Sequence, residues 1–80
     1  MKNLALNTIE VTIKRIWETT LGIHVNELNL NFFMLGGNSI QAFAIANDIH
    51  TAFNVEFSIS DFFDTLTIEN SVNIIQKRLK

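Results

Sequence analysis

Three segments of the chain carry apolar residues every three or four positions, the spacing that predicts a helix with one buried face. In the first segment the apolar positions are Ile9, Ile13, Ile16, Trp17 and Leu21. Thr8 precedes them and is a good helix cap, whereas Gly22 follows them and is the kind of residue that often ends a helix. We therefore expect a first helix over residues 8–21.

The second and third segments show the same period. Their apolar positions are Ala42, Ile45, Ile49, Ala52 and Phe53 in the second, and Ile68, Val72, Ile75 and Leu79 in the third. Asn54 tolerates the left-handed backbone that ends many helices, and Thr67 is a capping residue. The pattern predicts two further helices, over residues 39–53 and 67–79.

The segments between these helices have no helical period. Residues 22–38 contain enough apolar side chains to be held against a core, so we expect an ordered loop. Residues 55–59 alternate like a strand, but a lone strand would leave its backbone unpaired, which favours an extended connection. A short helix at 61–64, capped by Ser60, can follow. The pattern predicts an all-α four-helix bundle over residues 1–80, with a short third helix and a long loop between the first two.

We assign most aromatic side chains to the core, because aromatic residues at helical spacing usually serve packing. This set comprises Trp17, Phe32, Phe33, Phe53, Phe57, Phe62 and Phe63.

Composition narrows the possible functions. The chain has 80 residues, room for one domain, and its formal charge of −2 comes without a continuous basic stripe, which disfavours nucleic-acid binding. It has no cysteine, so any thiol must be supplied from outside. No apolar stretch approaches the length of a membrane span, and Met1 does not open a signal-peptide pattern. We therefore expect a cytoplasmic protein that contacts no membrane.

Ser39 is the candidate for chemistry, because it follows a glycine pair at the expected start of a helix. His50 lies eleven residues further along the same helix, about 16 Å away, too far to act as its base. His24 lies in the loop, but the residues around Ser39 do not form a nucleophile elbow. The two histidines lack the spacing of a metal site, and no phosphate-binding P-loop is present.

A helix N-terminus accommodates a phosphate, so Ser39 could carry a phosphorylated group that another enzyme attaches. The residue could equally be a plain helix cap, and the local sequence leaves both interpretations open.

Residues 31–40, NFFMLGGNSI, resemble the core motif of the phosphopantetheine-binding carrier proteins, in particular the peptidyl carrier, or thiolation, domains of nonribosomal peptide synthetases. The resemblance continues in Ile16-Trp17, Leu21-Gly22-Ile23, Phe53-Asn54-Val55-Glu56, Phe62-Phe63 and Thr67-Ile68. Asn54 replaces the family's usual glycine, and Leu66 stands where proline is common. The acidic second helix and Asp-Ser-Leu motif of fatty-acid carriers are missing, which favours the peptidyl type.

The resemblance implies that a phosphopantetheinyl transferase attaches 4'-phosphopantetheine to Ser39 from coenzyme A, with Mg²⁺. The arm would hold aminoacyl, peptidyl or aryl groups as thioesters, while the chain itself catalyses nothing. Adenylation, condensation and thioesterase domains would be its partners, and we expect a monomer. A polyketide or stand-alone acyl carrier is an alternative, as is a helical interaction module without a covalent cofactor.

The implied docking surface lies around the attachment point. Helical spacing places Phe43, Ala46, Asn47 and His50 on the same side as Ser39. We predict that Met34, Leu35, Ile40 and Phe43 contact partner enzymes. Phe43 has a second interpretation, in which its ring packs against the long loop.

Overall fold

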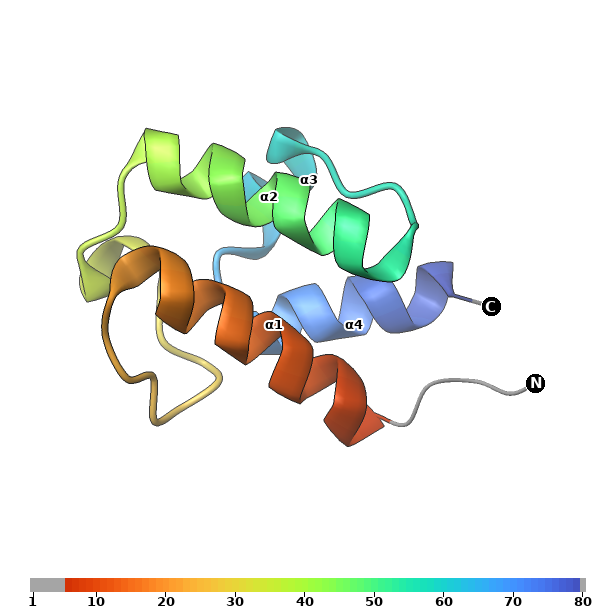
Figure 1. The fold of residues 1–80 in the computed structure, drawn as a ribbon, viewed down its shortest axis with the longest axis horizontal. Helices are drawn as coiled ribbons and strands as arrows, with labels where there is room; N and C mark the ends of the chain where they lie inside the picture. The colour runs from red at the N-terminus through yellow and green to blue at the C-terminus, as the bar shows by residue number, and fades with distance from the viewer. Residues whose placement is uncertain (1–5, 80) are drawn as a thin grey trace.

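The computed structural model describes residues 6–79 and contains four α-helices and a short 3₁₀ helix (Figure 1). The elements are α1 (Leu6–Leu21), η1 (Phe33–Leu35), α2 (Ser39–Phe53), α3 (Ile59–Thr65) and α4 (Ile68–Arg78). Within this described range there is no strand, which confirms the predicted all-α class. No helix among residues 6–79 combines the length and apolar character needed to cross a bilayer.

Two helices begin two residues earlier than predicted. α1 begins at Leu6, so Thr8 lies inside the helix, where its carbonyl accepts a hydrogen bond from the Thr12 hydroxyl. α3 begins at Ile59, and its cap is Ser58 rather than Ser60. Ser58 Oγ accepts from the backbone N–H of Asp61 at 3.1 Å, and the Asp61 carboxylate accepts from the Ser58 N–H at 2.9 Å. This reciprocal pair is a capping box, which is more stable than a single serine cap.

The other helix ends follow from single residues. Gly22 and Asn54 both adopt a left-handed backbone, with φ of 72° and 54°, directly after α1 and α2. Thr67 caps α4 by accepting the Asn70 N–H, so α4 begins one residue after the expected position.

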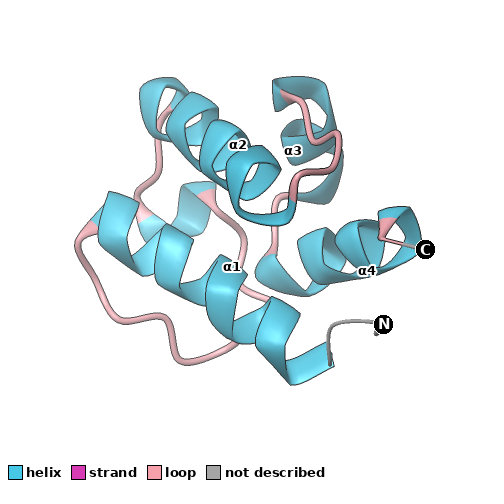
Figure 2. Ribbon diagram, turned by 45° about the vertical axis from the view of Figure 1, so that its right-hand side comes forward, coloured by secondary structure: helices cyan, strands magenta, loops and turns pink. Residues whose placement is uncertain are grey.

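The helices pack around one aromatic centre. α1 contacts both α2 and α4, and the short α3 bridges α2 and α4 (Figure 2). Trp17, Phe32 and Phe62 are fully buried, and their ring centroids lie 4.8 to 5.8 Å apart. Because the three rings come from α1, the long loop and α3, their contacts tie all three elements together.

Phe33 and Phe63 do not belong to this core, contrary to the prediction. They are 47% and 41% exposed, and they stack on each other with their centroids 6.2 Å apart. Each follows a fully buried phenylalanine, Phe32 or Phe62, and consecutive residues of a turn or helix point in different directions.

Leu66, where the family commonly has proline, ends α3 with a left-handed backbone at φ 57°. Proline holds φ near −65°, so this turn has a geometry that proline cannot adopt. The Leu66 N–H donates to the Phe62 carbonyl, and its own carbonyl accepts from the Phe32 N–H at 2.8 Å. The turn therefore fastens the long loop to the end of α3.

An ion pair fastens the start of α3 to the end of α4. Arg78 donates to both carboxylate oxygens of Asp61, at 2.7 and 3.2 Å, and also to the Glu56 carbonyl. Hydrogen bonds from Arg78 and from the Ser58 N–H lower the pKa of Asp61 from 3.8 to about 2.

Because folding lowers the pKa of Asp61, its ionised carboxylate stabilises the folded protein, and this stabilisation depends on pH. The stabilisation is complete above pH 3.8 and is lost as the pH falls towards about 2. We expect Asp61→Asn to be less stable than wild type at pH 7, with the difference shrinking between pH 4 and pH 2. Urea unfolding followed by Trp17 fluorescence measures this, and a difference that does not change with pH would contradict it.

Candidate functional site

Ser39 is the first residue of α2, and its side chain is exposed. The cap of this helix is Asn38, whose side chain accepts from the Gln41 N–H at 2.9 Å, while Gln41 Oε1 accepts from the Asn38 N–H at 3.0 Å. The interpretation of Ser39 as a plain cap is therefore wrong. Its hydroxyl has no hydrogen-bond partner within residues 6–79 and remains available for reaction. The Asn-x-x-Gln spacing is a capping-box signal that the sequence already contained.

The first turn of α2 is held against α1. The Gln41 side chain donates to the Thr20 carbonyl at 3.4 Å, close to the end of α1. On the other side of Gly22, the Glu18 carboxylate accepts from the Val25 N–H at 2.9 Å. This backbone hydrogen bond is the main reason that the pKa of Glu18 is lowered. Thus both the beginning of the long loop and the first turn of α2 are hydrogen-bonded to α1.

Of the glycine pair before Ser39, Gly37 lies where a larger residue would overlap the ring of Phe32. Gly37 passes so close to the Phe32 ring that an added Cβ would lie 2.3 Å from its Cζ atom. The Gly37 N–H also donates to the Phe32 carbonyl at 3.1 Å. Gly36 has open space around it, but its φ of 90° favours glycine. The ring of Phe32 therefore fixes the path by which the chain reaches Ser39.

The electrostatics of this region suit a phosphate. No residue from Leu28 to Asn47 carries a charged side chain, so no carboxylate from this stretch opposes an anion. The N-terminus of α2 adds about half a positive charge. The exposed Ser39 hydroxyl, this helix terminus and the uncharged stretch of chain on both sides of it fit a phosphate ester of the serine.

The two histidines have other contacts. His24 Nδ1 lies 3.3 Å from Glu18 Oε2, and His50 Nδ1 lies 2.7 Å from the Val55 carbonyl oxygen. The described residues contain no group of three or more histidine, aspartate and glutamate side chains that could hold a metal ion.

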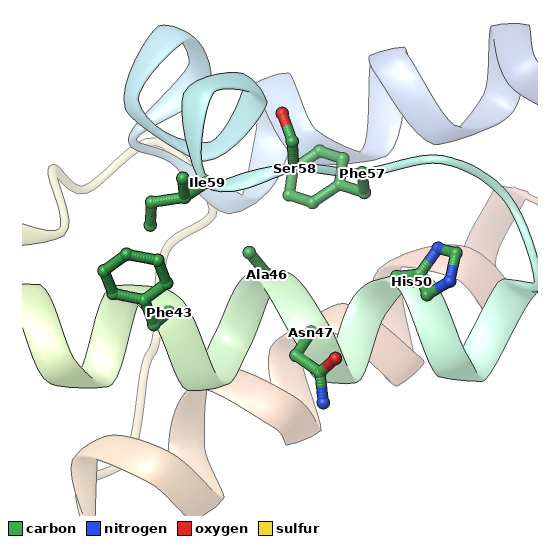
Figure 3. A pocket seen from close by; sticks show the side chains of 7 residues that line it. All are labelled: Phe43, Ala46, Asn47, His50, Phe57, Ser58 and Ile59. Carbon is green, nitrogen blue, oxygen red and sulfur yellow. The ribbon is translucent and has the colours of Figure 1, made fainter.

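The predicted docking residues divide into two kinds. Met34 and Ile40 are each 81% exposed and Phe43 is 61% exposed, whereas Leu35 is partly buried and packs against the core. The Phe43 ring faces Ile59 at the start of α3 (Figure 3), so the long loop does not cover it.

Comparison with known proteins defines the class. The family described as "Phosphopantetheine attachment site" matches residues 11–75, and the chain belongs to it. The chain is also similar to short segments of large peptide antibiotic synthases. Bacitracin synthase 1 of Bacillus licheniformis is 36% identical over 90% of this chain, and tyrocidine synthase 3 of Brevibacillus parabrevis is 36% identical over 80%. The chain spans only 1% of the length of each of these relatives.

Solved structures share the fold. The acyl carrier protein BlmI from Streptomyces verticillus, involved in bleomycin biosynthesis, superposes with a TM-score of 0.87 and 31% identity, over 94% of this chain and 90% of BlmI. A chain in the complex of the phosphopantetheine transferase Sfp with coenzyme A and a peptidyl carrier protein gives a TM-score of 0.84 and 28% identity. That match covers 96% of this chain and 100% of the other.

The contact between Gly37 and Phe32 predicts the effect of a single methyl group. We expect Gly37→Ala to lower the free energy of unfolding by about 1 to 3 kcal/mol, because Trp17 and Phe62 prevent the Phe32 ring from moving aside. Gly36→Ala is the matched control, since it strains the backbone without a clash. Denaturant unfolding, repeated in a Phe32→Leu background, tests the cause: a Gly37→Ala penalty that persists without the ring would contradict it.

Proposed function

We propose that Ser39 is the residue of this carrier to which 4'-phosphopantetheine is attached. The observation that supports this assignment is that Ser39 is exposed at the head of α2 and does not cap the helix. Asn38 caps it instead, by accepting a hydrogen bond from the Gln41 N–H. The helix is thus capped without any contribution from the Ser39 oxygen.

The reaction needs little from the chain itself. The Ser39 oxygen attacks the phosphorus that links the pantetheine portion of coenzyme A to its nucleotide. A new O–P bond forms, the bond to the nucleotide phosphate breaks, and the hydroxyl proton passes to a base. We assign that base and the Mg²⁺ to a phosphopantetheinyl transferase, so that this chain catalyses nothing. The attached arm then brings the thiol that the cysteine-free sequence lacks.

The cargo and partners follow from the same proposal. Aminoacyl, peptidyl or aryl groups would be held as thioesters for nonribosomal peptide synthesis. The likeness to an artificially fused adenylation and carrier di-domain, at a TM-score of 0.81 and 25% identity, supports loading by an adenylation domain. Condensation and thioesterase domains as later partners, a monomeric state and a cytoplasmic location stay predictions. The likeness to BlmI, a type-II acyl carrier protein, supports a second candidate, a free-standing carrier with the same attachment chemistry.

Loss of the hydroxyl tests the assignment directly. We expect wild-type protein incubated with coenzyme A, Mg²⁺ and a promiscuous phosphopantetheinyl transferase to gain one phosphopantetheine group by intact mass. Ser39→Ala should gain none. Ser60→Ala, which removes another exposed serine, is the control and should be modified like wild type. Modification of Ser39→Ala would contradict the proposal.

We propose further that Met34, Ile40 and Phe43 form the surface that partner enzymes contact, here named the docking patch. All three side chains are large, apolar and mostly exposed. They flank Ser39 on both sides in a stretch of sequence without charged residues, and contact with these three side chains would be apolar. Leu35 is left out of the patch, because it is partly buried and packs against the core.

Truncating the docking patch should weaken loading without unfolding the protein. We expect Phe43→Ala or Ile40→Ala to reduce kcat/KM for aminoacylation by a cognate adenylation domain about tenfold, the effect of losing roughly 1.4 kcal/mol at an interface. Val11→Ala is the control, because Val11 is 51% exposed on α1, outside the patch. Unchanged loading of Phe43→Ala, with an unchanged unfolding midpoint, would remove Phe43 from the patch.

A further inference from the structure

Phe43 of the docking patch lies against the head of α3. Its ring faces Ile59, the first residue of that helix, across the groove between α2 and α3 (Figure 3). Phe43 is 61% exposed, whereas its α2 neighbours Ala42 and Ile45 are fully buried in the core. The core therefore does not hold the Phe43 ring, and the place of Ile59 determines how far the ring can turn towards α3.

α3 is too short to hold its own first turn in place. It has seven residues, just under two turns, and an isolated helix of that length is unstable in water. Phe62 anchors α3 in the core, and the Leu66 carbonyl at its end accepts from the Phe32 N–H of the long loop. Both contacts lie after the first turn, so the position of Ile59 depends on other support.

Arg78, in the last turn of α4, attaches the first turn of α3 to another helix. Its guanidinium donates to both carboxylate oxygens of Asp61, from Nη1 at 2.7 Å and from Nη2 at 3.2 Å. Nη1 also donates to the Glu56 carbonyl at 2.8 Å. Asp61 and Glu56 stand on either side of Ile59 in the sequence. One side chain therefore fastens both ends of the segment that carries Ile59 to the same point of α4.

The geometry of this contact fixes direction as well as distance. A guanidinium that binds both oxygens of one carboxylate has a defined orientation, which the ammonium group of a lysine does not impose. The pair is partly exposed, with accessible fractions of 36% for the Arg78 side chain and 22% for that of Asp61, so its contribution to the free energy of unfolding is modest. The main consequence of the contact is therefore the placement of the α3 head.

We propose that Arg78 is a positioning residue for the docking patch. Through Asp61 and the Glu56 carbonyl it holds Ile59 beside Phe43, and thereby keeps the Phe43 ring in the position that a partner enzyme meets. Arg78 itself lies on α4, outside the patch, and acts without touching the partner. This inference rests on the proposed docking patch.

Nuclear Overhauser effects measure the positioning in the protein alone. We expect contacts between the Phe43 ring protons and the Ile59 methyl groups in the wild type, and weaker ones in Arg78→Gln. The contacts between Trp17 and Phe62 in the core are the internal reference and should keep their intensity, which shows that the variant is folded. Contacts of Phe43 with Ile59 that are equally strong in the wild type and in Arg78→Gln would overturn the inference.

Loading kinetics measure the consequence for docking. The probe is an adenylation domain that loads the wild-type protein, and intact mass first shows the arm, because a chain that gains none contradicts the attachment at Ser39 instead. We expect Arg78→Gln to raise KM for the carrier about threefold, within the range of one exposed ion pair, with kcat unchanged because the reacting groups are unaltered. Lys77→Gln removes one positive charge from the neighbouring exposed residue and should load like wild type.

A double variant separates positioning from general loosening of the fold. In a Phe43→Ala background we expect Arg78→Gln to leave KM unchanged, because the ring that it positions is missing. Arg78→Lys keeps the charge without the paired contact, and its KM should lie between those of the wild type and Arg78→Gln. Equal KM in the wild type and Arg78→Gln would overturn the inference, as would a rise that persists without Phe43. Unchanged loading of Phe43→Ala alone would contradict the docking patch itself, and the inference with it.

Discussion

The position of Ser39, the proposed attachment site, depends on the ring of Phe32. Trp17 and Phe62 enclose the ring, with centroids 5.5 and 4.8 Å away, and Gly37 crosses it too closely for any side chain at that position. The backbone N–H of Phe32 donates to the Leu66 carbonyl, and the Phe32 carbonyl accepts from the Gly37 N–H. Phe32 thereby joins α1, the end of α3 and Gly37, which lies two residues before the head of α2. A cavity at this point would disturb the fold and the path to Ser39 together.

The site combines a fixed backbone with a free hydroxyl. Asn38 and Gln41 satisfy the first turn of α2, and Gln41 also reaches the end of α1, so the helix start is supported without Ser39. The Ser39 hydroxyl thus stays accessible, as its proposed modification by another enzyme requires. Had Ser39 been the cap, its modification would have altered the oxygen that caps the helix and coupled loading to stability.

The sequence predicted the helices well because their core positions repeat at helical spacing, which depends on local geometry alone. It also indicated Ser39 through the glycine pair and the family motif. It did not separate Phe32 from Phe33, since both are equally apolar and only the packing of Trp17 and Phe62 decides which ring is enclosed. Asp61 decides that Ser58, and not Ser60, caps α3, because the Asp61 carboxylate completes the capping box with Ser58. The same carboxylate binds Arg78, seventeen residues away. Such long-range partners leave no periodic signal.

The exposed apolar residues near Ser39 follow from the same packing. Phe32 fills the core position of its segment, so the neighbouring Met34 can remain exposed without leaving a cavity. On α2, Ala42 and Ile45 face the core, which leaves Ile40 and Phe43 on the outer side. With no charged side chain between Leu28 and Asn47, a phosphate on Ser39 would supply the charge of this region. Under the proposed function, modification of Ser39 would therefore change the charge beside the proposed docking patch while leaving its apolar side chains unchanged, a difference by which a partner enzyme would distinguish the arm-bearing protein from the unmodified one.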